Sequence, residues 1–435
     1  MFQRKLIVVL SVAVLLAMTA GVSQGSWSRV EGMGLTVPAM SQFTDDYANM
    51  FAYPTSVVRQ NNIVWAELGN NPGGGVNGVD TEDQAFTLVR NFPRLGSIAF
   101  QMKQSALNST VASDNLNNEQ LDIIWGKAFS SFDFAVRLDI TNSSEEFTDS
   151  TPFGYEAHGI DFSGDPYPFG AAFFEDAIVG TGVEINTYGI TPAIAIHMDN
   201  DDRFEAAATY RRYTLDRSDS PAPGETWQDG GNASYSLNAR AILHRGGTHT
   251  WYPAAWYVND DLSWEVTGVT PTARSADESY KQFGIGISDN MRVNSDNLLL
   301  WGVMFAQDKH SYERTDNNDA VASGATKTFE EKHTMMPLVF AAIETQATSW
   351  LTVRIGASRG MLSSRDEFTD FGAPAFTFTD KTRESEFNFS LGTGIKWNNL
   401  DVDMTLNEEF PLSGGYILSG NEATPFTRVS ATYHF

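Results

Sequence analysis

The sequence of 435 residues contains no cysteine, so the folded chain does not rely on disulfides. Beyond its first 25 residues it has no apolar run long enough for a transmembrane helix, which needs about 20 consecutive apolar residues. Basic residues are scarce: 29 Lys and Arg stand against 54 Asp and Glu, and the net charge is −25. So acidic a chain would be repelled by phosphates, and nucleic acid is therefore not an expected partner.

The N-terminus has the pattern of a secretory signal peptide, assigned to residues 1–25. Arg4 and Lys5 form a short basic region, and the apolar run Leu6–Ala17 follows it. Because this run is too short to span a bilayer, we expect cleavage before Ser26. An uncleaved N-terminal anchor is the alternative. The remaining chain is expected to be exported.

Several segments alternate apolar and polar side chains, which is the pattern of a β-strand with two different faces. They include residues 132–140, 351–358, 387–396 and 400–407. In a transmembrane barrel the apolar residues face lipid and the polar residues face the lumen. A soluble β-sandwich would show the same periodicity around a core, so alternation alone leaves both folds open. The 29 Phe, 14 Tyr and 10 Trp fit the aromatic girdles of a barrel as well as a sugar-binding sandwich.

The C-terminal strand favours the barrel. One face of residues 425–435 carries Val429, Ala431, Tyr433 and Phe435, and the opposite face is polar. With Tyr433 and the final Phe435, the strand resembles the terminal signal by which bacterial outer-membrane barrels are recognised for insertion. The resemblance implies a place in the outer membrane of a double-membraned bacterium, with the barrel-assembly machinery as a partner.

Long and short connections alternate along the chain, as expected for long extracellular loops and short periplasmic turns. Long connections are expected at about 70–82, 104–118, 142–185, 214–231, 258–277, 310–330, 362–382 and 409–424. Their number predicts an all-β transmembrane antiparallel barrel of about 16 strands, with 14 as the nearest alternative. The predicted organisation is a signal peptide (1–25), a periplasmic or hatch-like segment (26–60) and the barrel (61–435).

A barrel of this size encloses an aqueous lumen. The basic residues predicted to line it are Arg137, Arg211, Arg240, Arg354, Lys396 and Arg428, and the acidic ones are Asp133, Asp139, Glu205, Asp401 and Asp403. These charges either pair with one another in the wall or create a transverse field that orients polar solutes. The glycines expected on the same face are Gly284, Gly286, Gly392 and Gly394. They leave room for a loop or plug, or permit barrel curvature.

The third long connection, Thr141 to about Ile185, is acidic and aromatic. With 16 expected strands and a long third loop, the chain resembles the general diffusion porins, in which that loop narrows the pore. The resemblance implies a constriction that includes Glu156, Asp161 and Asp165, and a homotrimer. It also implies passive diffusion of small hydrophilic solutes or ions, without catalytic residues, cofactor or metal. A plain surface loop is the alternative for this segment.

Residues 26–60 suggest a different transport mechanism. The stretches Gly32–Gly34 and Thr44–Phe51 resemble the start of the long-chain fatty-acid transporter family, where such a segment forms a hatch in the lumen. That family continues with Asn-Pro-Ala, whereas this chain has Ala52–Thr55, which reads Ala-Tyr-Pro-Thr. The resemblance implies, as the alternative to a porin, a hatch-containing transporter for hydrophobic compounds.

Two further hypotheses are a non-conducting structural or secretion-partner barrel and a soluble glycan-binding sandwich. The string Gly356–Gly360 matches G-x-S-x-G, but that motif needs a sharp strand-to-helix turn, and here it lies in an alternating strand. We therefore predict no enzyme. The acidic charge predicts cation preference in the pore, or contact of external loops with lipopolysaccharide through divalent cations.

Overall fold

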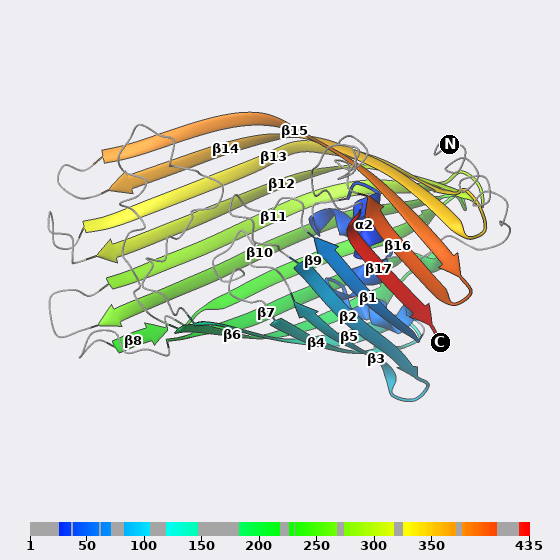
Figure 1. The fold of residues 1–435 in the computed structure, drawn as a ribbon, viewed down its shortest axis with the longest axis horizontal. Helices are drawn as coiled ribbons and strands as arrows, with labels where there is room; N and C mark the ends of the chain where they lie inside the picture. The colour runs from blue at the N-terminus through cyan, green and yellow to red at the C-terminus, as the bar shows by residue number, and fades with distance from the viewer. Residues whose placement is uncertain are drawn as a thin grey trace, which may run out of the picture.

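A computed structural model describes residues 26–35, 38–60, 62–70, 82–104, 119–146, 182–217, 226–229, 231–267, 274–316, 325–370, 376–406 and 426–435. These residues form an antiparallel β-barrel with short helical turns inside it (Figure 1). The strands are β1 (Ile63–Asn70), β2 (Glu82–Phe92), β3 (Gly96–Gln104), β4 (Glu119–Ala128), β5 (Phe132–Glu146), β6 (Gly182–His197), β7 (Arg203–Arg217), β8 (Thr226–Asp229), β9 (Ala233–Arg245), β10 (His249–Thr267), β11 (Arg274–Arg292), β12 (Asn297–Asp316), β13 (Ala325–Gln346), β14 (Leu351–Asp370), β15 (Phe376–Trp397), β16 (Leu400–Leu406) and β17 (Phe426–His434). Within the same residues, no helix has the length and apolar character needed to cross a membrane.

The strands pair in chain order, and the ring closes between the first and the last. Ile63 of β1 lies opposite Val89 of β2 on one side and opposite His434 of β17 on the other. The short β8 and the longer β9 both pair with β10, one after the other, so together they count as one interrupted strand of the barrel. With β8 and β9 counted as one, the 17 assigned strands make a closed barrel of sixteen strands. The predicted fold class and strand number are confirmed.

The alternation of the strands directs apolar side chains outward. In β16 the inward residues Asp401 and Asp403 are buried, while the apolar residues between them lie on the outer face. Large apolar residues on the outer wall stay exposed, including Ile285 at 59%, Phe387 at 64% and Trp397 at 73%. A closed barrel with buried charges inside and exposed apolar residues outside is stable only with lipid around it. The chain is a transmembrane barrel of the outer membrane, as predicted.

Short turns join the strands at one end of the barrel. Gly246 and Gly247 have φ values of 62° and 76° in the turn between β9 and β10, a left-handed backbone conformation that glycine adopts readily. Asn398 takes φ 54° in the turn between β15 and β16, and Asn tolerates this region better than most residues. Both turns are short and lie between the predicted long connections, as expected for the periplasmic end.

Six strands are longer than predicted. β10 to β15 contain 19 to 22 residues each, and they form the part of the wall that extends furthest from the short turns (Figure 1). Much of the connections expected at 258–277, 310–330 and 362–382 is therefore strand. The alternating apolar pattern ends at the edge of the lipid, but backbone pairing continues beyond it, because water does not interrupt an antiparallel ladder.

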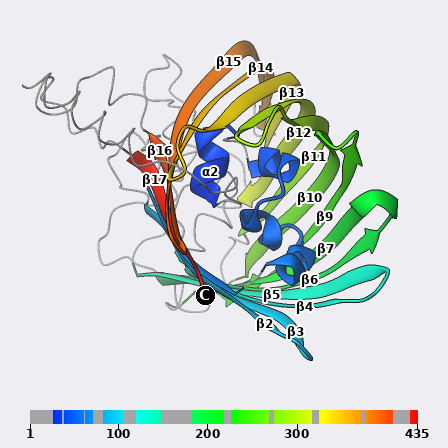
Figure 2. The same cartoon turned by 90° about the vertical axis from the view of Figure 1, so that its right-hand side faces the viewer.

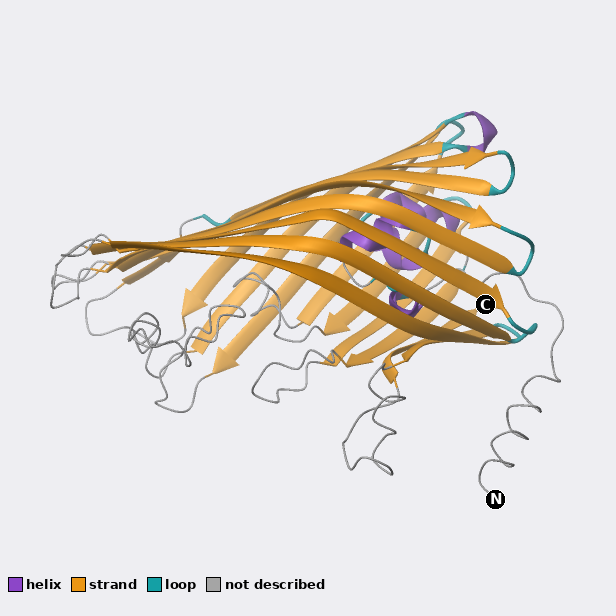
Figure 3. Ribbon diagram, turned by 90° about the horizontal axis from the view of Figure 1, so that it is seen from above, coloured by secondary structure: helices purple, strands orange, loops and turns teal. Residues whose placement is uncertain are grey.

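The helical turns lie inside the ring, towards the short-turn end. They are α2 (Trp27–Gly32), η1 (Pro38–Phe43), η2 (Tyr47–Phe51) and η3 (Pro54–Arg59). Figures 2 and 3 show them enclosed by the strands. The first turn begins at Ser26, whose Oγ accepts a hydrogen bond from the backbone N–H of Arg29 and caps α2. We call residues 26–35 and 38–60 together the plug.

Candidate functional site

The plug contacts the barrel wall on all sides. α2 lies against β14 to β17, η1 against β10, and η3 against β3 to β6. Arg59 reaches Glu205 on β7, and Phe43 packs on Phe340 of β13 with ring centroids 5.2 Å apart. Met50 and Tyr53 in the middle of the plug have no exposed surface. The described part of the plug therefore crosses the lumen from wall to wall.

Glycine lets the two backbones meet at α2. A Cβ on Gly392 of β15 would lie 2.7 Å from the Cα of Gly32. A Cβ on Gly356 of β14 would lie 1.8 Å from the carbonyl oxygen of Met33, next to Gly34 with its φ of +73°. The prediction that inner-face glycines make room for a plug is confirmed at Gly392. It is also confirmed at Gly286, where a Cβ would meet the ring of Phe43.

One buried charge network joins the plug to β13, β14 and β16. Arg29 donates two hydrogen bonds to Glu344, at 2.8 and 3.0 Å, and also pairs with Asp46 of the plug. Arg354 shares Glu344 at 2.6 Å and pairs with Asp403 at 2.8 Å. Burial alone would lower the pKa of Arg29, but Asp46 and Glu344 outweigh burial and raise it. Arg29 is therefore a permanent buried cation, and its two carboxylate partners balance its charge.

A second network joins the plug to β7 and β9. Glu205 accepts hydrogen bonds from Arg59 of the plug at 2.7 Å, from Arg203 at 2.9 Å and from Arg240 at 2.7 Å. Asp45 of the plug pairs with Arg203 at 2.6 Å and Arg59 at 3.3 Å. Burial would raise the pKa of the Asp45 carboxyl, but the guanidinium groups of Arg59, Arg203 and Arg240 hold it well below its usual value. Asp45 therefore stays ionised at neutral pH.

Arg240 also recognises the plug backbone. Its Nη1 donates to the carbonyl oxygens of Thr44 at 2.7 Å and Gln42 at 3.2 Å. Its guanidinium lies 4.3 Å from the ring centroid of Tyr53, a cation–π contact. Arg240 thus holds the plug through an ion pair with Asp45 at 3.6 Å, two carbonyl groups and an aromatic ring. Such a fixed arrangement specifies a single docked position for the plug.

Two other predicted lumen cations contact the plug. Arg137 donates to the Phe51 carbonyl oxygen at 2.8 Å and to Asp122 of β4 at 2.6 Å. Arg428 pairs with Glu31 of α2 at 2.9 Å. Both therefore bridge plug and wall.

Apart from Lys396, the remaining predicted lumen residues that the structure describes pair within the wall. Arg211 donates to Asp139 at 2.8 Å. Asp133 lies 3.0 Å from His197, and Asp401 lies 3.1 Å from His434. Lys396 is opposite Asp401 in the strand register. The acidic residues Glu156, Asp161 and Asp165 lie outside the described residues, as does the rest of the expected third-loop constriction.

Part of the inner wall is apolar, which the sequence-based assignment of a polar lumen missed. Beside the plug, β10, β12 and β13 turn buried apolar residues inward: Tyr252, Ala254, Trp256, Leu300, Met304, Leu338, Phe340 and Ala342. They pack on the plug residues Val30, Met33, Leu35, Met40 and Phe43. An open aqueous pore would leave this surface in contact with water, at an unfavourable free energy.

Several other residues at the plug–wall contact were not predicted: Arg29, Asp45, Asp46, Arg59, Arg203 and Glu344. Glu344 could have been recognised from the sequence. It shares the inward face of β13 with Leu338, Phe340 and Ala342 and is the only charged residue of those four. The outward Tyr433 and Phe435 of the predicted insertion signal are exposed, and the guanidinium of Arg90 lies 5.4 Å from the Phe435 ring centroid.

No protein family matches this sequence, and no curated protein does either. Solved structures of outer-membrane receptors are similar at a low level. The ferric-catecholate import receptor Fiu from E. coli K12 is 10% identical over 86% of this chain and 82% of its own, with a TM-score of 0.35. The siderophore receptor PiuA from Acinetobacter baumannii is 7% identical over 86% and 82%, with a TM-score of 0.36. The FrpB iron transporter from Neisseria meningitidis is 7% identical over 88% and 84%, with a TM-score of 0.34.

The plug in the lumen contradicts the predicted function as a passive porin. A passive diffusion porin requires a continuous aqueous path, but here the described plug residues contact the wall on all sides and bury an apolar surface against it. The porin interpretation is therefore wrong. Among the described residues, the predicted lumen charges other than Lys396 pair in the wall or with the plug.

Proposed function

We propose that this chain is a gated outer-membrane transporter for small apolar or amphipathic compounds, which pass when the plug moves away from the wall. The observation that carries the proposal is the apolar inner wall of β10, β12 and β13, which the plug covers. When the plug shifts, that wall offers a binding surface to an apolar solute. The solute then replaces the contacts of Met33, Met40 and Phe43.

The two charge networks support a plug that docks in one position and can also leave it. Buried ion pairs fix geometry more than they add stability, because desolvation offsets much of their attraction. The contacts that separate are between plug and wall, whereas β-strand pairing around the ring stays intact. Movement of a short segment inside a rigid barrel is therefore the smallest change that opens the lumen.

A reversible lock tests the proposal. The chain has no cysteine, so introduced thiols are unique. Ser390 of β15 donates to the carbonyl oxygen of Glu31 in α2 at 2.6 Å, which places the Glu31→Cys and Ser390→Cys side chains on facing backbones. Oxidation or a short thiol crosslinker should stop the influx of an apolar fluorescent probe into cells that produce the double variant, and reversal of the crosslink should restore it.

The single variant Ser390→Cys is the control and should be insensitive to oxidation. A polar probe of similar mass measures any simple leak. If the crosslinked protein, verified on a gel, admits the apolar probe as fast as the open form does, plug movement is not required and the proposal fails. If neither form admits either probe faster than cells without the protein, the chain is a non-conducting structural barrel instead.

A further inference from the structure

Five basic residues lie side by side across five neighbouring strands. In the strand register Lys281 of β11 is opposite Lys309 of β12, and Lys309 is opposite Lys332 of β13. Lys332 is opposite Arg365 of β14, and Arg365 is opposite Lys381 of β15. We call this row the basic ladder. It occurs in a chain whose acidic residues outnumber its basic ones almost two to one, with 54 against 29.

The ladder is on the outer face of the barrel. Side chains alternate between the two faces of a strand, and Lys281 shares its face with the exposed Phe283 and Ile285. Arg365 likewise shares its face with the exposed Met361 and Ile355 of β14. The bulge in β13 between Met335 and Val339 shifts the register by one residue and brings Lys332 onto this same outer face. The five cations therefore point away from the lumen.

The ladder begins where the lipid-facing surface ends. Lys281 is the next outward residue beyond Phe283, and on β15 the outward series runs from Phe387 through Ser385 and Arg383 to Lys381. From Val353 to Arg365 a strand rises about 40 Å along its axis, or about 30 Å in height at a tilt of about 40°, against an apolar band about 25 Å tall. The basic ladder thus lies at the headgroup level on the long-loop side, rising obliquely from β11 to β15.

Like charges directly opposite each other destabilise a sheet, so the ladder needs counter-charge. The chain supplies part of it: Glu330 pairs with Lys309 at 2.7 Å, and Glu367 pairs with Arg365 at 2.6 Å. Within the described residues, no ion pair involves Lys281, Lys332 or Lys381, and all three are exposed. Three of the five cations are therefore available to an external anion.

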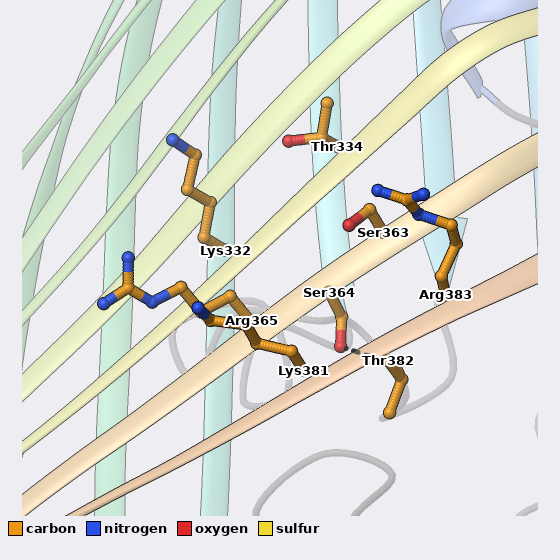
Figure 4. Close-up of a pocket in the computed structure, with 8 residues that line it drawn as sticks. All are labelled: Lys332, Thr334, Ser363, Ser364, Arg365, Lys381, Thr382 and Arg383. Atoms are coloured by element: carbon orange, nitrogen blue, oxygen red, sulfur yellow. Dashed lines mark hydrogen bonds between the residues drawn. The ribbon is translucent and has the colours of Figure 1, made fainter.

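The ladder also borders a hollow of suitable chemistry. Lys332, Arg365, Lys381 and Arg383 surround an open hollow of about 510 Å³ on β13, β14 and β15 (Figure 4). The hydroxyl groups of Thr334 and Ser363, which are opposite each other in the register, line the same hollow. Guanidinium, ammonium and hydroxyl donors converging on one place are the groups that bind phosphate.

We propose that the basic ladder binds the phosphate groups of a phosphorylated lipid headgroup in the outer leaflet, whose acyl chains lie on the apolar wall below it. Phe283 of β11, Phe305 of β12 and Phe387 of β15 are the lipid-facing residues nearest to the ladder on their strands. A phosphorylated lipid satisfies both surfaces at once, which a free phosphate cannot do. The proposal does not depend on the plug or on transport.

The test uses the purified full chain in detergent and measures retention of lipid A by native mass spectrometry. The ladder variant Lys281→Gln, Lys332→Gln and Lys381→Gln should bind lipid A at least about tenfold more weakly, the equivalent of one charge-assisted contact. The matched control Arg94→Gln, Arg212→Gln and Arg292→Gln removes the same charge from exposed positions outside the ladder and should bind like wild type. Heat-dependent gel migration verifies that each variant is folded.

Two further ligands separate the possible sources of phosphate. Dephosphorylated lipid A should bind wild type and the ladder variant equally and weakly. Inorganic phosphate at millimolar concentration should not displace lipid A from wild type. The proposal is overturned if the ladder and control variants lose lipid A to the same extent, if removing the phosphates leaves binding unchanged, or if inorganic phosphate alone competes with the lipid.

Discussion

Gly32 of the plug and Gly392 of the barrel wall meet backbone to backbone, so closely that a Cβ on Gly392 would lie 2.7 Å from the Cα of Gly32. A side chain at either position would push the two segments apart. The neighbouring strand repeats the relationship with Gly356, whose Cα faces the carbonyl group of Met33. The docked plug thus depends on missing side chains as well as on the charges that surround it.

Replacement of Gly356 by Ala should undock the plug without unfolding the barrel. The new Cβ would lie 1.8 Å from the Met33 carbonyl oxygen, and a backbone atom cannot move aside as a flexible side chain can. We expect faster cleavage of residues 26–60 by added protease, with unchanged heat-dependent gel migration. Gly360→Ala on the same face of β14 is the control, because its Cβ would meet only flexible side chains, Leu338 at 3.0 Å and Met335 at 3.5 Å. Equal protection of both variants would contradict the backbone contact.

Removal of the Arg29 charge should weaken docking strongly. Arg29→Met leaves the buried Asp46 without the guanidinium group, and breaking a buried pair in this way costs about 3 to 5 kcal/mol. Glu344 keeps Arg354, so the barrel wall itself should remain intact. Arg245→Gln breaks the half-exposed pair with Asp202 and should cost less than about 1 kcal/mol. Protease protection of the plug in urea measures both effects, and similar losses would refute the network's role.

The contribution of Asp45 to docking should not change with pH between about 5 and 8. The pKa of Asp45 in the docked plug is held below its usual 3.8 by Arg59, Arg203 and Arg240, which outweigh the effect of burial. A carboxyl whose pKa is lowered by folding contributes stability above its unfolded pKa, and this contribution fades as the pH falls through the lowered value. We therefore expect the difference in protease protection between wild type and Asp45→Asn to shrink only below about pH 4. Asp45→Asn should dock more weakly at neutral pH and lose less on acidification.

Equal protease protection of wild type and Asp45→Asn near pH 6 would contradict this assignment. Glu205 faces Asp45 across the same three arginines and is the other acidic group of the cluster. Glu205→Gln should therefore weaken docking as Asp45→Asn does, but it changes the wall rather than the plug. Comparing the two variants separates the effect of losing the carboxylate on the plug from the effect of losing the carboxylate on the wall.

The architecture was predictable because the bilayer imposes a simple rule on each strand. Ile355 faces lipid between the buried residues Arg354 and Gly356, and the sequence shows this alternation directly. The sequence did not show where strands such as β13 end, because outward residues become polar at the membrane edge while backbone pairing continues. The inner wall was harder still. Phe340 and Glu344 lie on the same inward face of β13. An apolar residue and an acid on one face are explained by the plug, because Phe43 packs on Phe340 and Arg29 binds Glu344.

The plug itself was suggested by sequence but not placed. The Gly32–Gly34 stretch suggested a hatch through its resemblance to the long-chain fatty-acid transporter family, and Gly392 was expected to leave room for a plug. The structure places Gly32 against Gly392. The wall partners of Arg29 and Arg59, Glu344 and Glu205, could not be predicted, since they lie 315 and 146 residues away in the chain, and no local pattern encodes such long-range contacts.

Single-channel conductance in a planar bilayer shows whether residues 26–60 close the lumen. The full chain and a chain without residues 26–60 would be compared after gel migration shows that both barrels are folded. We predict no stable large conductance steps from the full chain and frequent large steps from the shortened one. Stable large steps from the full chain, unchanged by the deletion, would mean that residues 26–60 do not close the lumen.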